Sequence, residues 1–172
     1  MNGSPQRPLL FLDVDGPLIP FGARSQPYPT YTHGVVLGAS GNPLLSRLNP
    51  AHGPRLAALP CDLVWATTWT IDANELIAPR LGLPPLDVVL WDGTSADGEL
   101  EESDARSGLH WKTRTLVAWA AGRPFVWVDD EITGVDRDWV TAHHPSPTLL
   151  HRVDPRQGLP DDDYAALHAW LR

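Results

Sequence analysis

Five short apolar runs recur along the chain, and segments of mixed character with turn residues at their borders separate them. The first run, Leu9 to Leu12, is apolar at every position, which is typical of a central parallel strand buried on both faces. An amphipathic helix fits most of the intervals, and this alternation predicts a Rossmann-like, doubly wound parallel sheet of about five strands. The expected strands are residues 8–14, 62–66, 87–91, 124–128 and 148–153, and the expected helices are residues 50–59, 72–81, 111–121, 136–143 and 161–171.

Two segments interrupt the alternation. Residues 17–49 are rich in Pro, Gly, Tyr and Ser and contain one alternating stretch, Thr32 to Leu37, so we expect a β-hairpin flap over the end of the first strand. Residues 92–108 are acidic, and we expect a solvated loop there. Neither segment is long enough for a large cap domain, and the 172 residues (1–172) suit a single α/β domain.

Polar side chains gather where the expected strands end, which is the edge at which open α/β sheets bind their ligands. The residues concerned are Asp13, Asp15, Thr67, Thr68, Trp69, Asp129 and Asp130. Lys112, the one lysine among 13 basic residues, opens the helix before the fourth strand, although a helix N-terminus disfavours a cation. Four clustered carboxylates repel one another, so we expect Lys112 and a divalent cation to lie among them.

These motifs resemble those of the haloacid dehalogenase (HAD) superfamily of phosphatases. The match comprises Asp13-Val-Asp-Gly after a hydrophobic strand, a threonine after the second strand, a lysine at the start of a later helix, and an Asp-Asp pair after a further strand. The first motif alone is common, whereas all four in the family's order, over residues 11–131, form a specific pattern. The resemblance implies a phosphomonoester hydrolase that acts through an aspartyl-phosphate.

The resemblance also implies a role for each catalytic residue. Asp13 attacks phosphorus as the nucleophile, and Asp15 protonates the leaving alcohol and then activates the water. Relatives that cleave carbon–halogen or carbon–phosphorus bonds lack an acid at the position of Asp15, so its presence favours phosphate esters. Thr67 donates a hydrogen bond to a phosphoryl oxygen, and Lys112 neutralises charge on the nucleophile and the transferring group.

The implied cofactor is Mg²⁺. Its ligands would be Asp13, the backbone carbonyl of Asp15, and a carboxylate of the Asp-Asp pair, with Asp129 and Asp130 left as alternatives.

Three further residues are expected around the substrate. Gly16 allows the backbone to turn sharply beside the phosphate. Thr68 is an alternative to Thr67 as the donor to a phosphoryl oxygen, or it caps the turn. Trp69 and Trp111 could each stack on a base or another ring of the substrate.

A capless member of the superfamily has an open site. Such sites serve large substrates or macromolecular ends, or another subunit closes them, so we expect a phosphorylated small molecule or macromolecular end as substrate and allow for a homo-oligomer. The doubled aspartate also resembles the phosphatase domains of polynucleotide end-repair enzymes and of carboxy-terminal-domain protein phosphatases.

Charge and composition exclude several function classes. With 21 acidic against 13 basic residues, extended nucleic-acid binding is unlikely, although a short contact is compatible with this balance. No apolar run approaches the roughly 18 residues of a membrane span, so we expect no membrane association and no targeting segment. The single cysteine, Cys61, excludes an internal disulfide and a zinc site with paired cysteines, which fits a cytoplasmic protein.

Three alternatives stay open. A receiver-type phospho-switch also groups acids, a threonine and a lysine around Mg²⁺, but its acidic pair comes first along the chain, whereas here Asp129 and Asp130 come last. A catalytically silent phosphate-binding or interaction domain is disfavoured because every expected catalytic position is occupied. An end-processing phosphatase acting on nucleic-acid termini is the third.

Overall fold

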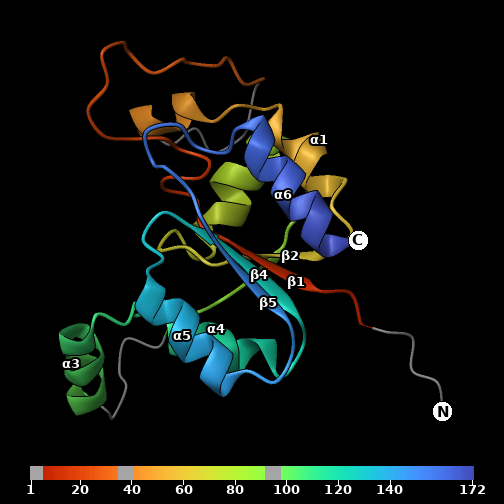
Figure 1. The fold of residues 1–172 in the computed structure, drawn as a ribbon. Coiled ribbons are helices and arrows are strands. Elements are labelled where there is room, and N and C mark those ends of the chain that lie inside the picture. Colours follow the sequence, from red (N-terminus) through yellow and green to blue (C-terminus); the bar gives the residue numbers. More distant parts are fainter. Residues whose placement is uncertain (1–5, 35–40, 92–97) are drawn as a thin grey trace.

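The computed structural model describes residues 6–34, 41–91 and 98–172 of the chain (Figure 1). Five parallel strands form one sheet in the order β3-β2-β1-β4-β5, which confirms the predicted doubly wound α/β fold. The strands are β1 (Leu9–Leu12), β2 (Asp62–Trp65), β3 (Asp87–Val88), β4 (Phe125–Asp129) and β5 (Thr148–Arg152). The helices are η1 (Pro43–Arg47), α1 (His52–Ala57), η2 (Ala73–Ile77), α2 (Ala78–Leu81), α3 (Gly98–Ser107), α4 (Thr113–Ala120), α5 (Gly134–His143) and α6 (Asp161–Leu171).

The central strand β1 is buried along its whole length, as its continuous apolar run predicted. Because side chains alternate across a strand, Leu10 and Leu12 enter one core layer, whereas Leu9 and Phe11 enter the other. The first layer is covered by α1, α2 and α6, and the second by α4 and α5 (Figure 1). The sheet is therefore a rigid platform whose strand ends are held from both sides.

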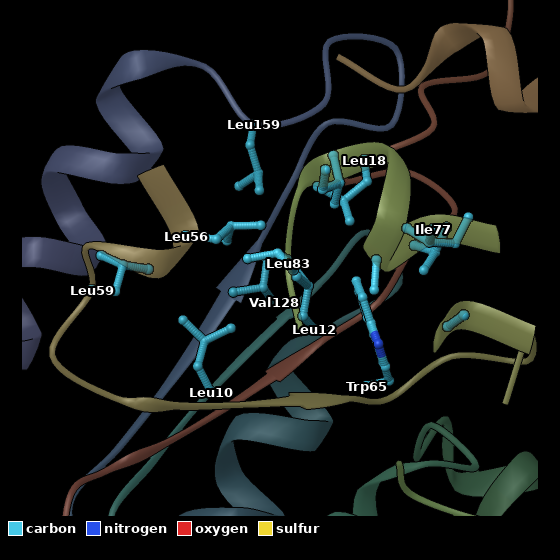
Figure 2. Packing of buried hydrophobic residues seen from close by; sticks show 14 of the residues in the cluster. Leu10, Leu12, Leu18, Leu56, Leu59, Trp65, Ile77, Leu83, Val128 and Leu159 are labelled. Atoms are coloured by element: carbon cyan, nitrogen blue, oxygen red, sulfur yellow. The ribbon is translucent and has the colours of Figure 1, made fainter. Parts of the chain in front are cut away.

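Leucine side chains dominate the first layer. Figure 2 shows Leu10, Leu12 and Val128 of the sheet facing Leu56 of α1, with Leu159 from the loop before α6 beside them. These five side chains are at most 4% exposed. Burying a side chain of this size contributes roughly 1.5–3 kcal/mol, so this layer is a major source of stability.

The long segment after β1 differs from its prediction. Within residues 17–34 and 41–49, the chain forms turns, extended backbone and the 3₁₀ helix η1, and the expected β-hairpin is absent from these ranges. Part of the alternating stretch, residues 35–37, lies outside the described residues. A segment this rich in proline lacks many of the backbone N–H donors that a ladder needs, which explains why no strand forms in the described parts.

The acidic segment 92–108 also differs, because residues 98–107 form helix α3 rather than a loop. Its carboxylate Asp104 accepts two hydrogen bonds from Arg114 of α4, at 2.5 and 2.7 Å. This pairing is non-local, and the local acidic composition gave no indication of it. Residues 92–97 lie outside the described residues. In the described part of the chain, no helix has both the length and the apolar character needed to cross a bilayer.

Candidate active site

The ends of β1 and β4 bring the predicted carboxylates together. These strands pair in parallel with Leu12 opposite Val128, and the Asp13 N–H continues the ladder by donating to the Val128 carbonyl at 3.0 Å. Connections leave the sheet in opposite directions at this point, because β2 lies beyond β1 on one side and β5 beyond β4 on the other. Such a switch point is where open α/β sheets form their ligand sites.

Lys112 lies between two carboxylates. It is the residue immediately before α4 and is 3% exposed. Its Nζ is 3.1 Å from Oδ2 of Asp13 and 2.8 Å from Oδ2 of Asp129. Burial lowers the pKa of Lys112, but the charges of Asp13 and Asp129 outweigh it, so the pKa is raised overall and the ammonium group stays charged. The two carboxylates thus compensate for the unfavourable field of the helix N-terminus.

Asp13 lies in a setting that disfavours its charge. Its Oδ1 accepts the Val14 N–H at 2.8 Å. Burial raises the pKa of Asp13 to about 7, Lys112 opposes this rise, and the charge of Asp129 adds to it. Lys112 supplies one positive charge for the two buried carboxylates of Asp13 and Asp129, which leaves a net negative charge when both are ionised. A further cation would therefore stabilise the ionised form of Asp13.

The adjacent residues Asp129 and Asp130 have different surroundings. Asp129 is fully buried, and its Oδ2 accepts hydrogen bonds from Lys112 and from the Trp127 indole N–H at 3.2 Å. Its Oδ1 accepts the Glu131 N–H at 3.0 Å. The carboxylate of Asp130 lines a pocket, and among the described residues no other side chain donates to it. Burial, followed by the charge of Asp129, raises the pKa of Asp130 to about 6.

Gly16 allows Asp130 to approach the turn after β1. Its φ of +98° lies in the region that only glycine adopts readily, and a Cβ at this position would come within 2.7 Å of Asp130 Oδ1. This close approach places the Asp130 carboxylate over the backbone that follows Asp13 and Asp15.

The carboxylates fit a hard divalent cation. One oxygen from each of Asp13, Asp129 and Asp130 lies within 4.8 Å of the others. An all-oxygen donor set is what Mg²⁺ prefers, and a cation here would offset the burial and the repulsion that raise the pKa values of Asp13 and Asp130. Because Asp129 already satisfies both its oxygens with protein donors, Asp130 is the member of the pair with a carboxylate available to a metal.

His110, Asp129 and Glu131 form a second cluster of metal-ligating residue types. Both ring nitrogens of His110 already have hydrogen-bond partners in the protein. His110 Nδ1 accepts the Lys112 N–H at 3.1 Å, so its other nitrogen carries the proton and donates to Glu131 at 3.1 Å. We interpret this cluster as a hydrogen-bond chain that holds the start of α4.

Asp15 faces the same pocket as Asp13, and the chain bends at Val14 between them. Its Oδ2 accepts the Trp69 indole N–H at 3.1 Å. Burial raises the pKa of Asp15, and the bond from Trp69 and the charge of Lys112 oppose the rise. A raised pKa suits a carboxyl that must carry a proton. Trp69, predicted to contact substrate, thus orients Asp15, and it is not among the residues that line this pocket.

The two threonines after β2 point in different directions. Thr67 is fully buried, and its Oγ1 accepts the Trp69 N–H at 3.2 Å. Its carbonyl accepts the Trp91 indole N–H at 2.9 Å, which fixes the turn. Thr68 is exposed and lines the pocket. Their proposed contacts with a phosphoryl oxygen stay predictions.

The pocket at Asp13 has a volume of about 200 Å³. Its rim includes Trp111, which is 50% exposed, and Phe21, which is 41% exposed. Sequence reasoning missed Phe21 as a lining residue, because nothing in the local pattern of a proline-rich segment indicates which side chain turns inward. The sequence places Glu131 beside Asp130 after the fourth strand, but no role was assigned to it. Sequence reasoning also missed the Trp127 indole, which is buried in β4 and faces Asp129. The full lining is Asp13, Asp15, Phe21, Thr68, Trp111, Lys112, Asp130 and Glu131.

Comparison with known proteins supports the assignment made from the motifs. A family model described as the HAD domain in Swiss Army Knife RNA repair proteins matches residues 9–164, which is nearly the whole chain. Searches of the curated proteins and of the solved structures found no match. The matched range contains every carboxylate of the site, together with Lys112 and both threonines. The chain therefore belongs to the haloacid dehalogenase superfamily, in the family of HAD domains of Swiss Army Knife RNA repair proteins.

Proposed function

We propose that the protein is a Mg²⁺-dependent phosphomonoester hydrolase that acts through an aspartyl-phosphate. The observation that carries this proposal is the buried bridge of Lys112 between Asp13 and Asp129, with Asp15 and Asp130 facing the same pocket. A nucleophile, an acid positioned two residues away, a fixed cation and a free carboxylate for a metal are the groups that phosphoryl transfer through a carboxylate needs.

In the first step, an oxygen of Asp13 attacks phosphorus as the bond from phosphorus to the leaving alcohol breaks. Asp15 gives its proton to that alcohol oxygen, so the alcohol leaves neutral and Asp15 becomes a carboxylate. Lys112 stabilises the negative charge that develops on the phosphoryl oxygens, and the Val14 N–H orients the attacking carboxylate.

In the second step, the ionised Asp15 takes a proton from a water molecule. The water oxygen forms a bond to phosphorus, the bond from phosphorus to Asp13 breaks, and inorganic phosphate is released. Both carboxyls then have their starting protonation states. Asp13, Asp130 and the Asp15 carbonyl would hold Mg²⁺, which would neutralise charge on the nucleophile and the transferring phosphoryl group. Asp129 acts through Lys112, because it holds the ammonium group in place.

The substrate that we propose is the phosphorylated end of a nucleic-acid strand. Two observations support this class. The family to which the chain belongs is described from RNA repair proteins. The pocket at Asp13 is rimmed by Trp111 and Phe21, both of which expose much of their rings and can stack on a base.

Phosphate release from a panel of phosphomonoesters tests the proposal. The panel contains sugar phosphates, nucleotides, phosphopeptides and oligonucleotides phosphorylated at either end, each assayed with Mg²⁺ and with EDTA. We expect Mg²⁺-dependent turnover, highest on the oligonucleotides, that Asp13→Asn abolishes. Asp138→Asn is the matched control, because Asp138 lies exposed on α5, outside the site.

Turnover that persists in Asp13→Asn would refute the nucleophile assignment. Failure to hydrolyse any ester, together with retained binding of inorganic phosphate, would identify a silent phosphate-binding domain instead. A preference for sugar phosphates or phosphopeptides would refute the nucleic-acid substrate alone.

A further inference from the structure

The acidic residues are unevenly distributed along the chain. Residues 16–61 contain three arginines and two histidines but neither Asp nor Glu, although the chain as a whole has 21 acidic residues and a formal net charge of −8. This acid-free segment follows Asp15 directly, and its described part lies on the side of the sheet that carries α1 and α6 (Figure 1). The net charge therefore conceals a basic region next to the site.

Two arginines of this segment share one aromatic ring. The guanidinium carbon of Arg24 is 4.8 Å from the centre of the Tyr28 ring, and that of Arg47 is 4.6 Å from the same point. Among the described residues, no carboxylate lies within ion-pair distance of either guanidinium group. Arg55, in contrast, pairs with Asp161 at 2.8 Å. Both arginines line the same hollow, so an anion bound in that hollow would be attracted by two cations that no carboxylate among the described residues neutralises.

A third arginine adjoins the pair from the loop after β5. The side chain of Arg156 packs against Gly22, where an added Cβ would meet its Cγ at 3.2 Å. Gly22 in turn accepts a hydrogen bond from the Tyr28 hydroxyl at 3.1 Å. Asp154 pairs with Arg156 at 3.1 Å, so the three arginines together keep a net positive charge. We call Arg24, Arg47 and Arg156 the arginine cluster.

Residues of the arginine cluster line two surface hollows, and one of these hollows shares a lining residue with the pocket at Asp13. Phe21 lines both the pocket at Asp13 and a neighbouring hollow of about 560 Å³, which Arg152 and Arg156 also line. A further hollow of about 330 Å³ is lined by Arg24 and Arg47, and also by Pro20, the residue before Phe21. Phe21 thus lies between the catalytic pocket and the hollow of Arg156, and its chain neighbour Pro20 lines the hollow of Arg24 and Arg47.

We propose that the arginine cluster binds the phosphodiester backbone of a nucleic-acid strand whose terminal phosphate enters the pocket at Asp13. Guanidinium groups suit this task because their N–H donors match two phosphate oxygens at once. Phe21, between the two sites, stacks on a base near the strand end. A contact of two or three phosphates is short, which agrees with the overall negative charge of the chain. This inference rests on the proposed substrate class.

The aromatic side chains favour a nucleic acid over an acidic peptide. Tyr28 lies within the arginine cluster, Tyr31 lines the same hollow as Arg24 and Arg47, and Phe21 is exposed beside the catalytic pocket. Arginine interleaved with aromatic rings is a typical surface for single strands, because phosphates and base faces alternate along them.

Binding of terminally phosphorylated oligouridylates to protein carrying Asp13→Asn tests the inference, since this background leaves the strand intact. We expect affinity to increase with strand length up to a few nucleotides. Adding Arg24→Ala and Arg47→Ala is expected to raise Kd about tenfold, because two surface charge pairs with phosphates are lost. The magnitude of the slope of log K against log salt concentration is expected to fall by about 1.4, because two phosphate contacts to a single strand are lost. Adding Arg24→Lys and Arg47→Lys keeps the charge and is expected to have a smaller effect.

The matched control is Arg106→Ala with Arg172→Ala, which removes the same charge from exposed positions on α3 and at the C-terminal residue. An equal loss of affinity in this control would refute the arginine cluster as the site, as would an unchanged Kd in the Arg24 and Arg47 variant. Circular dichroism and thermal unfolding show whether the variant is folded.

The inference and the proposed function fail in different ways. In the catalytically active chain, the ratio of kcat/KM for an oligonucleotide to that for p-nitrophenyl phosphate is expected to fall about tenfold when Arg24 and Arg47 are replaced. If the unmodified protein hydrolyses neither ester, the proposed function fails, whereas the binding measurement still tests the arginine cluster. Arginine-dependent binding of a phosphopeptide without binding of the oligouridylate would overturn the nucleic-acid assignment.

Discussion

Replacing Asp13 with asparagine is expected to remove a loss of stability that the metal-free protein suffers as pH rises, and to abolish turnover. Asp13 is 7% exposed, and burial together with the nearby charge of Asp129 raises its pKa from 3.8 to about 7, despite the opposing effect of Lys112. Asparagine is nearly the same size and never ionises. When its carbonyl oxygen accepts the Val14 N–H, its amide NH2 takes the place of the oxygen that faces Lys112, a cost that does not change with pH in this range. The substitution therefore removes a buried charge whose presence the fold disfavours.

The size of the effect follows from the two pKa values. Between 3.8 and about 7, the unfolded chain has lost the Asp13 proton and the folded chain keeps it, so the folded state binds more protons and its stability falls as pH rises. The full shift corresponds to about 4 kcal/mol above the folded-state pKa. Asparagine does not titrate, so the stability of the variant relative to the wild type is expected to rise by about 2–3 kcal/mol between about pH 5 and pH 7.5.

Urea unfolding in EDTA, followed by tryptophan fluorescence at the two pH values, measures this difference. Taking the difference between variant and wild type cancels the other titrating groups, and Asp138→Asn controls for loss of a surface charge. Adding Mg²⁺ is expected to stabilise the wild type more than the variant, because the ion compensates the charge of Asp13. A stability difference that stays the same at both pH values would refute the reasoning.

Three further substitutions probe the neighbours of Asp13. Lys112→Met leaves the two buried carboxylates that flank it without a cation, so we expect loss of turnover and about 3 kcal/mol lower stability at neutral pH, measured by phosphate release and urea unfolding. Asp15→Asn is expected to reduce kcat for an alkyl phosphate about tenfold more than for p-nitrophenyl phosphate, whose leaving group needs little protonation; equal losses would exclude Asp15 as the acid. Gly16→Ala forces a Cβ to within 2.7 Å of Asp130 Oδ1 at a φ of +98°, so we expect a cost of about 1–2 kcal/mol and a higher Mg²⁺ requirement, read from a magnesium titration of activity. An unchanged magnesium requirement would argue against Asp130 as a ligand.

The fold could be predicted because its main signal is local. A run such as Leu9 to Leu12 needs apolar surroundings on both faces wherever the rest of the chain lies, and parallel strands place their polar ends at one edge. Prediction failed where contacts between different elements decide the structure. Helix α3 is paired to α4 through Asp104 and Arg114, and its acidic composition alone indicated a loop.

The site shows the same division. Motif order alone predicted that Asp13, Asp15, Asp129 and Asp130 share an edge with Lys112, because each follows a strand or begins a helix. Nothing in the sequence distinguishes the two neighbouring aspartates, however. In the structure their surroundings differ. Lys112 and the indole N–H of Trp127 donate hydrogen bonds to one oxygen of Asp129, whereas the carboxylate of Asp130 packs against Gly16 and lines the pocket.

Strand periodicity and the parallel sheet allow few arrangements at the strand ends, so the residue order already specifies which chemical groups gather there. Tertiary contacts specify which oxygen faces which donor, how burial shifts the pKa of Asp13, and that Arg24 and Arg47 both lie against the ring of Tyr28. The physical reason is that periodicity is encoded in neighbouring residues. Hydrogen-bond partners, desolvation and charge clusters, in contrast, depend on groups that are distant in the chain and come together only in the folded protein.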